Sequence, residues 1–327
     1  MPLKLKLPNL QENILFANHT TFRIGGPARY FLISKDENEL LAALRAAKES
    51  ATPFFILGGG SNLLVADEGF DGLVIKVQSS KFKVQNDSNP FVQRTNQDNS
   101  SCKIIVEAGT PFTRIILETT KNGYAGVQWG FGIPGTIGGA ICGNAGRLGQ
   151  AISEVVLEVK ILDKNLNEKI VPSDKCEFDY RGSRFKKTGE IILEATLVFK
   201  KEKQELINKI LNEAKEVIKN SPPFPSAGCV FKNYQVGEGD SLLKNHPELS
   251  ERVRGGKIGV GYLIDQCGLK GKQAGGAKIW EGHANYIINA GGASAKDVLT
   301  LIDLCKKEVR KKYEVDLKEE IRYLKME

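Results

Sequence analysis

Glycine is concentrated in three segments of this chain of 327 residues. Of its 34 glycines, 26 fall within residues 58–72, 123–149 and 255–292. Glycine adopts backbone conformations that other residues avoid, but it loses more conformational entropy on folding than they do. The clusters show no G-X-Y period, which excludes a collagen-like chain. Such clusters in a globular chain indicate tight turns or a backbone that approaches a ligand closely.

The first cluster, LGGGSNLLVAD (57–67), follows a predicted buried strand at residues 53–57. Three glycines at a strand end allow backbone N–H groups to approach a pyrophosphate. Their spacing fits neither GxGxxG nor GxxxxGK[ST], so the Rossmann and P-loop interpretations fail. A tight structural turn is the alternative for this segment.

The second cluster, GFGIPGTIGGAICGNAG (130–146), is more specific. Its density of glycine, with Ile, Pro, Thr and Asn, indicates backbone lying flat against a large ligand. A loop that only connects two strands is the alternative. The third cluster, residues 262–276, is typical of a helix that ends in glycine, and a structural turn explains it equally well.

The length predicts two or three domains with enough buried core to need neither disulfides nor metal ions. The fractions of hydrophobic residues, 41%, and charged residues, 26%, are ordinary for a globular protein and argue against disorder. The net charge of +7 suits an anionic partner. Because the basic residues are scattered among acidic ones, we do not expect nucleic acid to be that partner.

Nothing in the sequence predicts a membrane or secretory protein. No stretch of 18 apolar residues is present, and the N-terminus lacks the apolar core and cleavage site of a signal peptide. The six cysteines form no CxxC pair, and no metal site is expected. We expect a cytoplasmic protein with reduced thiols, buried in all cases but Cys229. The cysteines are Cys102, Cys142, Cys176, Cys229, Cys267 and Cys305.

Hydrophobic periodicity predicts a mixed sequence of strands and helices. The polar segment 78–103 is predicted to be an exposed loop or a loosely ordered hairpin tip. The Pro-rich run 221–225 must end the helix before it, and we place a domain boundary near that helix. Strands are predicted at 28–34, 53–57, 63–66, 73–77, 103–108, 154–162, 168–172, 191–199 and 320–324, and helices at 37–47, 112–122, 200–220 and 295–313.

Two polar segments carry side chains suited to chemistry. Residues 180–184 (YRGSR) place two guanidinium groups in one loop, and arginine suits carboxylate or phosphate, although a surface salt bridge is the alternative. Residues 225–233 (PSAGCVFKN) place small residues around one thiol, which can donate a proton at neutral pH. A core cysteine is the alternative there. Three histidines and no G-x-S-x-G segment make metal and hydrolase sites difficult to assemble.

Taken together, eight segments resemble the UDP-N-acetylenolpyruvoylglucosamine reductase family, the flavoenzymes of peptidoglycan precursor synthesis. The resemblance spans nearly the whole chain and is to the shorter subtype of the family. In order, the segments are NHTTFRIGGPA (18–28), LGGGSNLLVAD (57–67), GIPGTIGGAICGNAG (132–146), DYRGSRFK (179–186), PSAGCVFKN (225–233), GYLIDQCGLKG (261–271), EGHANYIIN (281–289) and LKEEIR (317–322).

The resemblance implies an α+β fold with a two-lobed FAD-binding module of the vanillyl-alcohol-oxidase (PCMH) type and a C-terminal α+β substrate-binding domain. The implied lobes are residues 1–77 and 78–203, and the implied substrate domain is 204–327. FAD is expected to be held non-covalently. The residues implied to bind it are Leu57, Gly58, Gly59, Gly60, Ser61, Asn62, Leu63, Gly135, Thr136, Gly138, Gly139, Asn144 and Ala145.

The resemblance also implies the chemistry. NADPH reduces the flavin, and the reduced flavin then delivers a hydride to the enolpyruvyl group of a UDP-sugar, giving UDP-N-acetylmuramate. The implied catalytic residues are Arg181, Cys229 and Glu320, with Cys229 as the proton donor in place of the serine of the most familiar members. The residues implied to contact substrate are Tyr180, Lys232, Asn233 and His283. We expect a monomer.

Two other functions are weighed against this one. The first is an oxygen-using oxidase of the same flavin superfamily, and the second is a nucleotide-binding protein without activity. The PSAGC segment and the EEIR segment disfavour the oxidase, which would not need this pair of acids. The presence of all three implied catalytic residues disfavours the inactive protein.

Overall fold

The computed structural model describes residues 7, 9–86 and 101–324, which fold into two compact units. Each unit combines segments that are distant in the sequence. The first unit comprises Met1–Glu12, Tyr30–Gly59 and Gly72–Lys219, and the second comprises Asn13–Arg29, Gly60–Asp71 and Asn220–Glu327. The division predicted from the sequence, into residues 1–77, 78–203 and 204–327, separates the chain by function rather than by compactness. It stays a prediction.

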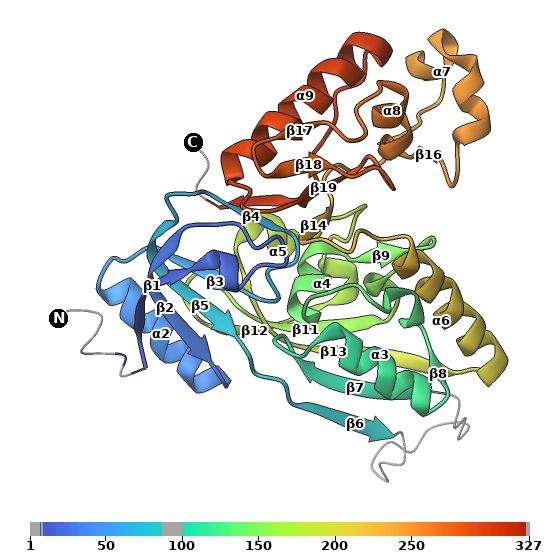
Figure 1. Ribbon diagram of the computed structural model, residues 1–327. Helices are drawn as coiled ribbons and strands as arrows, with labels where there is room; N and C mark the ends of the chain where they lie inside the picture. The colour runs from blue at the N-terminus through green and yellow to red at the C-terminus, as the bar shows by residue number, and fades with distance from the viewer. Residues whose placement is uncertain (1–6, 8, 87–100, 325–327) are drawn as a thin grey trace. The chain divides into compact units, whose positions relative to one another are not determined.

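The larger sheet of the first unit is antiparallel, with strand order β12-β11-β13-β7-β6 and β8 paired to β13 (Figure 1). Alternate residues of β7 are buried, because side chains of a strand point to opposite faces in turn. A core around the fully buried Trp129 covers one face of the sheet. The strands are β6 (Phe82–Asn86), β7 (Ser101–Glu107), β8 (Tyr124–Ala125), β11 (Val156–Leu162), β12 (Glu168–Pro172) and β13 (Ile191–Lys201).

Three helices accompany this sheet. Helix α3 (Phe112–Lys121) and the short helix α4 (Ile137–Gly143) contribute Ile115 and Ile141 to the core. Helix α6 (Gln204–Lys219) contacts the turn at residues 128–130, and its Ile207 and Ala214 are buried. The second glycine cluster, residues 130–146, therefore begins beside the buried aromatic core and contains α4.

A smaller sheet has the order β1-β2-β5-β3, and β3 runs parallel to β5. Asp36 is the N-cap of helix α2 (Glu37–Glu49). Its carboxylate accepts a hydrogen bond from the Glu39 N–H at 2.9 Å. The apolar face of α2 packs with residues of β2 and β5. The strands are β1 (Gln11–Leu15), β2 (Pro27–Ser34), β3 (Phe54–Leu57) and β5 (Phe70–Val77).

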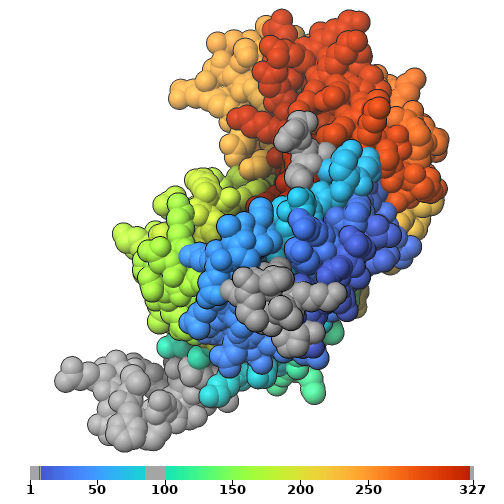
Figure 2. Space-filling model, turned by 90° about the vertical axis from the view of Figure 1, so that its left-hand side faces the viewer, coloured from blue at the N-terminus to red at the C-terminus, as the bar shows by residue number. Residues whose placement is uncertain are grey.

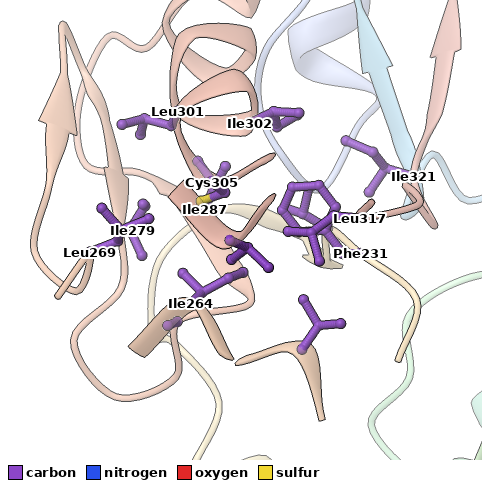
Figure 3. Packing of buried hydrophobic residues seen from close by; sticks show 14 of the residues in the cluster. Phe231, Ile264, Leu269, Ile279, Ile287, Leu301, Ile302, Cys305, Leu317 and Ile321 are labelled. Atoms are coloured by element: carbon purple, nitrogen blue, oxygen red, sulfur yellow. The ribbon is translucent and has the colours of Figure 1, made fainter. Parts of the chain in front are cut away.

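The second unit has an antiparallel sheet of order β14-β19-β18-β17, which packs against helix α9 (Ala295–Tyr313). Its core is aliphatic around Phe231, and Figure 3 shows Ile287, Ile302 and Leu317 converging there. The strands are β14 (Ser226–Cys229), β17 (Gln273–Ala274), β18 (Ala277–Ile279) and β19 (Tyr286–Asn289), and the other elements are α7 (Ser241–Asn245), α8 (Val260–Gln266), β15 (Tyr234–Gln235) and β16 (Lys257–Ile258).

Two N-terminal segments complete this second core. Strand β4 (Leu63–Val65) pairs in parallel with β20 (Arg322–Leu324), and Phe22 and Leu64 are fully buried in the same cluster. In Figure 2 the blue surface of these segments adjoins the orange and red surface of the C-terminal part. The unit is therefore built from three pieces of chain.

Helix α9 receives its N-terminal cap from one of those segments. The Asp67 carboxylate accepts hydrogen bonds from the Ala295 N–H at 2.8 Å and the Lys296 N–H at 3.3 Å. Ser294 and Asp297 form a capping box at the same helix end. Several backbone N–H groups that the helix leaves without internal partners are thus satisfied, two of them by Asp67, which lies 228 and 229 residues away in the sequence.

Most predicted elements are confirmed, with differences that have local causes. Residues 82–86 form strand β6 (Phe82–Asn86), which pairs antiparallel with β7, so the described part of 78–103 fits the hairpin alternative rather than the loop; residues 87–100 lie outside the described part. Helix α6 begins at Gln204 because β13 runs on to Lys201. Helix α4 was not predicted. The α+β class is confirmed.

All six cysteines are thiols, and three of the five that were expected to be buried are buried. Cys102, Cys176 and Cys305 are buried, whereas Cys142 and Cys267 are partly exposed because they lie at the ends of the short helices α4 and α8. Burial raises the pKa of Cys305 to about 12, which makes that thiol inert at neutral pH. Within residues 7, 9–86 and 101–324, no helix is both long and apolar enough to span a bilayer.

Candidate active site

The first two glycine clusters meet in the first unit, backbone against backbone. A Cβ atom on Gly59 would lie 2.6 Å from the Cα of Gly135, and one on Gly58 would lie 2.8 Å from the Thr136 hydroxyl oxygen. Buried Leu57 fixes the end of β3 directly before them. Glycine is therefore required at Gly59 by the close approach of another main chain.

Helix α4 holds the second of these backbones in place. Its first N–H groups, of Ile137 and Gly138, donate to carbonyls of the strand-to-helix turn at Thr110 (2.9 Å) and Ala108 (2.8 Å). The Thr136 hydroxyl accepts from the Gly139 N–H at 3.3 Å. A Cβ on Gly138 would lie 2.8 Å from the Ala108 Cβ, so packing explains that glycine.

Asn144 ends α4 and joins it to the loop that carries Tyr180 and Arg181. It has a left-handed backbone, with φ of 43°, and its side-chain amide donates to the Asp179 carbonyl at 2.8 Å. The buried Ser183 hydroxyl donates to the Cys142 carbonyl at 2.8 Å from the other side of the loop. The glycine segment and the arginine loop are therefore fixed to each other.

Arg181 itself has a left-handed backbone, with φ of 63°. Such a conformation is costly for a residue with a Cβ, and it is found mostly where function or tight geometry requires it. The loop closes through two hydrogen bonds between Asp179 and Gly182. The Arg181 guanidinium lies 5.4 Å from the centre of the Tyr180 ring, and its Nη1 is 3.0 Å from where a Cβ of Gly146 would be.

The second arginine of this loop has a structural role. Arg184 forms two hydrogen bonds with the Glu190 carboxylate, at 2.8 and 2.9 Å. Burial acts to raise the pKa of Glu190, but the bonds from Arg184 and Thr188 outweigh it, and the pKa is lowered. The salt bridge considered as the alternative for this pair of arginines is thus present at Arg184, where it is partly buried.

In the second unit, Cys229 ends β14 at a register shift in its pairing with β19. Gly228 before it has φ of 80°, although no atom would lie within 4 Å of a Cβ there, so torsion rather than space favours glycine. Asn285, 2% exposed, holds the residues that follow: its carbonyl accepts from the Val230 N–H (2.8 Å), and its side chain bonds both backbone groups of Phe231 (2.9 and 2.8 Å).

Glu320 lies on the chain segment that pairs with this one. An antiparallel bridge joins Phe231 to Glu319, and the Glu320 N–H donates to the Val230 carbonyl at 2.8 Å. The Glu320 carbonyl in turn accepts from the side-chain amide of Asn62 at 3.1 Å. The structure therefore brings the backbones of Asn62, Glu320 and the residue after Cys229 together.

Thr21 is a residue that the sequence reasoning did not single out. Its hydroxyl donates to the Ser226 carbonyl at 2.8 Å, and its N–H donates to the Gly60 carbonyl at 3.1 Å. Gly60 has φ of 63°, and a Cβ there would lie 2.2 Å from the His19 carbonyl oxygen. The signal was present, because Thr21 lies in the segment 18–28 that carries the family resemblance.

The four residues expected to contact substrate divide between the units. Tyr180 lies beside Arg181 in the first unit, and the other three lie in the second. The Asn233 side-chain oxygen accepts from the Val260 N–H at 3.3 Å, which gives it a role at the start of α8. The Lys232 N–H donates to the Lys318 carbonyl at 2.9 Å.

His283 contacts the edge of Tyr286, with ring centres 5.4 Å apart, and its Nδ1 accepts from the Asn285 N–H at 3.2 Å. Its side chain is exposed at the surface. Even so, desolvation by the surrounding protein lowers its pKa, and the nearby Lys270 charge lowers it further. The lowered pKa favours the neutral ring, in which Nδ1 accepts from the Asn285 N–H and Nε2 carries the proton as a donor.

The touching glycine backbones fit a flat, anionic cofactor. Gly59 and Gly139 are exposed while the residues on either side of them anchor the two segments, so main chain rather than side chains forms that surface. A backbone surface permits close approach of ring systems and phosphates. Among the residues that the structure describes, no group of three His, Cys, Asp or Glu side chains is arranged to hold a metal ion.

Comparison with protein families gives two matches. The family model described as FAD binding domain matches residues 28–165. The chain is therefore an FAD-dependent oxidoreductase in its general class. A second family model, UDP-N-acetylenolpyruvoylglucosamine reductase, C-terminal domain, matches residues 218–324.

Curated relatives with this same name match the chain over most of their own length. The UDP-N-acetylenolpyruvoylglucosamine reductase of Bacillus subtilis is 35% identical over 308 residues, which are 93% of this chain and 90% of that protein. The one from Caldanaerobacter subterraneus is 35% identical over 320 residues, 96% and 94% of the two chains. This chain belongs to the UDP-N-acetylenolpyruvoylglucosamine reductase family.

A solved structure confirms the fold expected from the resemblance. The crystal structure of UDP-N-acetylenolpyruvylglucosamine reductase from Thermus caldophilus matches with a TM-score of 0.71 at 28% identity, over 96% of this chain and 99% of that one. The α+β fold is thus the FAD-binding module of the PCMH type followed by the C-terminal domain of this family.

Gly59→Ala tests whether the contact between the two glycine backbones supports FAD. The added Cβ must separate Gly59 from Gly135, so we expect the dissociation constant for FAD to rise at least about tenfold. Fluorescence titration of apoprotein with FAD measures it. Gly237→Ala is the matched control, because Gly237 is exposed and its Cβ would meet no atom within 4 Å. Equal affinity of the two variants would contradict the assignment.

Proposed function

We propose that this chain uses NADPH to reduce UDP-N-acetyl-3-O-enolpyruvylglucosamine to UDP-N-acetylmuramate, a step of peptidoglycan precursor synthesis. The relatives named for this substrate support the proposal. The observation that carries it in this chain is the backbone pairing of Glu320 with the residue after Cys229, at 2.8 Å. That pairing keeps the two residues proposed as acids on adjacent segments.

FAD would be held without a covalent bond by two backbone segments, residues 57–63 and 135–145. The redox chemistry that FAD would supply when bound is uptake of a hydride from NADPH and transfer of a hydride to the terminal carbon of the enolpyruvyl group. The chain's task is to hold the cofactor, orient the sugar nucleotide and exclude water. The contact between Gly59 and Gly135 supports the first of these tasks.

Arg181 and Glu320 are proposed to stabilise the charge that develops on the substrate. Hydride addition builds negative charge on an enolate beside the substrate carboxylate. A guanidinium and a protonated carboxyl group donate hydrogen bonds to such a charge, and they are most effective in a dry site. The left-handed backbone of Arg181, with φ of 63°, supports a functional reason for its placement.

Cys229 is proposed as the general acid that completes the reduction. It would give its thiol proton to the carbon next to the carboxylate while the enolate collapses. A thiol is a stronger acid than the serine hydroxyl of familiar family members, so the role is compatible with cysteine. Tyr180, Lys232, Asn233 and His283 are proposed to contact the substrate, with the neutral His283 as a hydrogen-bonding group.

We further propose that the enzyme works as a monomer in the cytoplasm, without nucleic acid. The scattered positive charge supports the absence of nucleic acid, because it suits small anions such as FAD, NADPH and a UDP-sugar. Light scattering of the purified protein should give a mass near 35.9 kDa. A concentration-independent mass of twice that value would contradict the monomer.

Flavin spectroscopy tests the function directly. Purified protein should be yellow, anaerobic NADPH should bleach the flavin absorbance, and the enolpyruvyl substrate should restore it. A colourless protein that FAD cannot reconstitute would exclude the proposal. Bleaching followed by rapid recovery in air alone, with no response to substrate, would favour an oxidase.

Alkylation tests the role of Cys229. Iodoacetamide should abolish turnover, while Cys229→Ser should keep activity within about tenfold and become resistant, because a hydroxyl can still donate the proton. Cys229→Ala should lose about 10²–10⁴-fold in the rate of substrate reduction. Cys267→Ser controls for reaction at another partly exposed thiol. Complete modification of Cys229 with unchanged turnover would rule out the assignment.

A further inference from the structure

Asn62 is bound to the chain segment of Glu320 at two points. Its side-chain amide donates to the Glu320 carbonyl at 3.1 Å, and its own carbonyl accepts from the Arg322 N–H at 3.0 Å. The parallel pairing of β4 with β20 begins only at Leu63 and Arg322. The Asn62 side chain therefore supplies a partner for the Glu320 carbonyl just beyond the end of the ladder.

The other side of Glu320 is fixed as well. Its N–H donates to the Val230 carbonyl at 2.8 Å, and the Val230 N–H donates to the Asn285 carbonyl at 2.8 Å. A chain of hydrogen bonds thus runs from the Asn62 side chain through Glu320 and Val230 to buried Asn285. Cys229 is the residue directly before Val230, so this chain also fixes one end of the thiol's segment.

We propose that Asn62 is a positioning residue for Glu320, and this rests on the proposed function. Its amide group holds the Glu320 backbone against Val230, and so places the carboxyl group that acts on the enolpyruvyl substrate. Asn62 thereby joins the glycine-rich segment proposed to hold FAD to the segment of the proposed acid. A small displacement of a catalytic group is costly, because about 1 Å can reduce a rate about 100-fold.

The chemistry of asparagine at this position is specific. The Asn62 amide donates to the Glu320 carbonyl while its main chain leads directly into β4. Aspartate has the same shape, but it would place a carboxylate oxygen against the Glu320 carbonyl oxygen. Alanine removes the donor and leaves the bond from Arg322 to the Asn62 carbonyl intact.

The two halves of the catalytic cycle separate this role from a general structural one. Glu320 is proposed to act only when the enolpyruvyl substrate is reduced, and oxidation of NADPH does not require it. Loss of the Asn62 amide should therefore slow the second half-reaction much more than the first. General damage to the fold or to FAD binding would reduce both equally.

The test compares Asn62→Asp and Asn62→Ala with the parent holoenzyme by anaerobic stopped-flow, each saturated with FAD. We expect substrate-dependent recovery of flavin absorbance to slow about 10–100-fold, and bleaching by NADPH, which also depends on the FAD segment that contains Asn62, to slow at least about fivefold less. Asn208→Asp is the matched control, because it makes the same change on an exposed face of α6. Glu320→Ala is measured as the reference for loss of the carboxyl group.

Three outcomes decide the matter. Slowing that is at least about fivefold greater in the substrate step than in the NADPH step, in both Asn62 variants, supports the positioning role. Equal loss of both steps, or normal rates in both variants while Glu320→Ala is slow, overturns it and leaves the proposed function standing. A normal substrate step in Glu320→Ala instead overturns the role of Glu320 in the proposed function, and the positioning role with it.

Discussion

Hydrogen bonds between distant segments of sequence are the interactions on which the second unit depends. Thr21 bonds the strand before Cys229, Asn62 bonds Glu320, and Asp67 caps α9. Each bond reaches backbone groups that their own strand or helix leaves without a partner. A buried or half-buried backbone group without a partner costs free energy, so these side chains determine where the C-terminal segments can lie. The segment geometry proposed for catalysis follows from them.

The glycine clusters serve more than one physical purpose. Gly59 is required because another backbone passes 2.6 Å from where its Cβ would be, whereas Gly228 is favoured by its torsion angle alone. Gly138 is explained by packing on Ala108. Clustering therefore indicated tight turns or close backbone approach, while the reason for each glycine needed the structure.

Much of the fold could be predicted because its elements have strong local signals. Helix α9 has the predicted bounds, since its apolar residues repeat at helical spacing and a capping box begins it. Helix α4 was not predicted, because glycine has a low intrinsic helix propensity and tertiary bonds to Ala108 and Thr110 hold the helix. Arg181, Cys229 and Glu320 came from family resemblance rather than from spacing, and their roles stay predictions. Thr21 and Asn285 were missed because their partners lie far away in sequence.

The composition of the second unit from separate pieces of chain has a consequence for dissecting the protein. The family model for the C-terminal domain covers residues 218–324, yet the core of that unit also contains Phe22, Ile24 and Leu64. A fragment that starts at Asn220 would lack these side chains, the partner strand of β20 and the Asp67 cap of α9. The region that sequence comparison delimits as a domain is thus smaller than the body that folds, and a recombinant piece cut at its boundary would expose an open hydrophobic face.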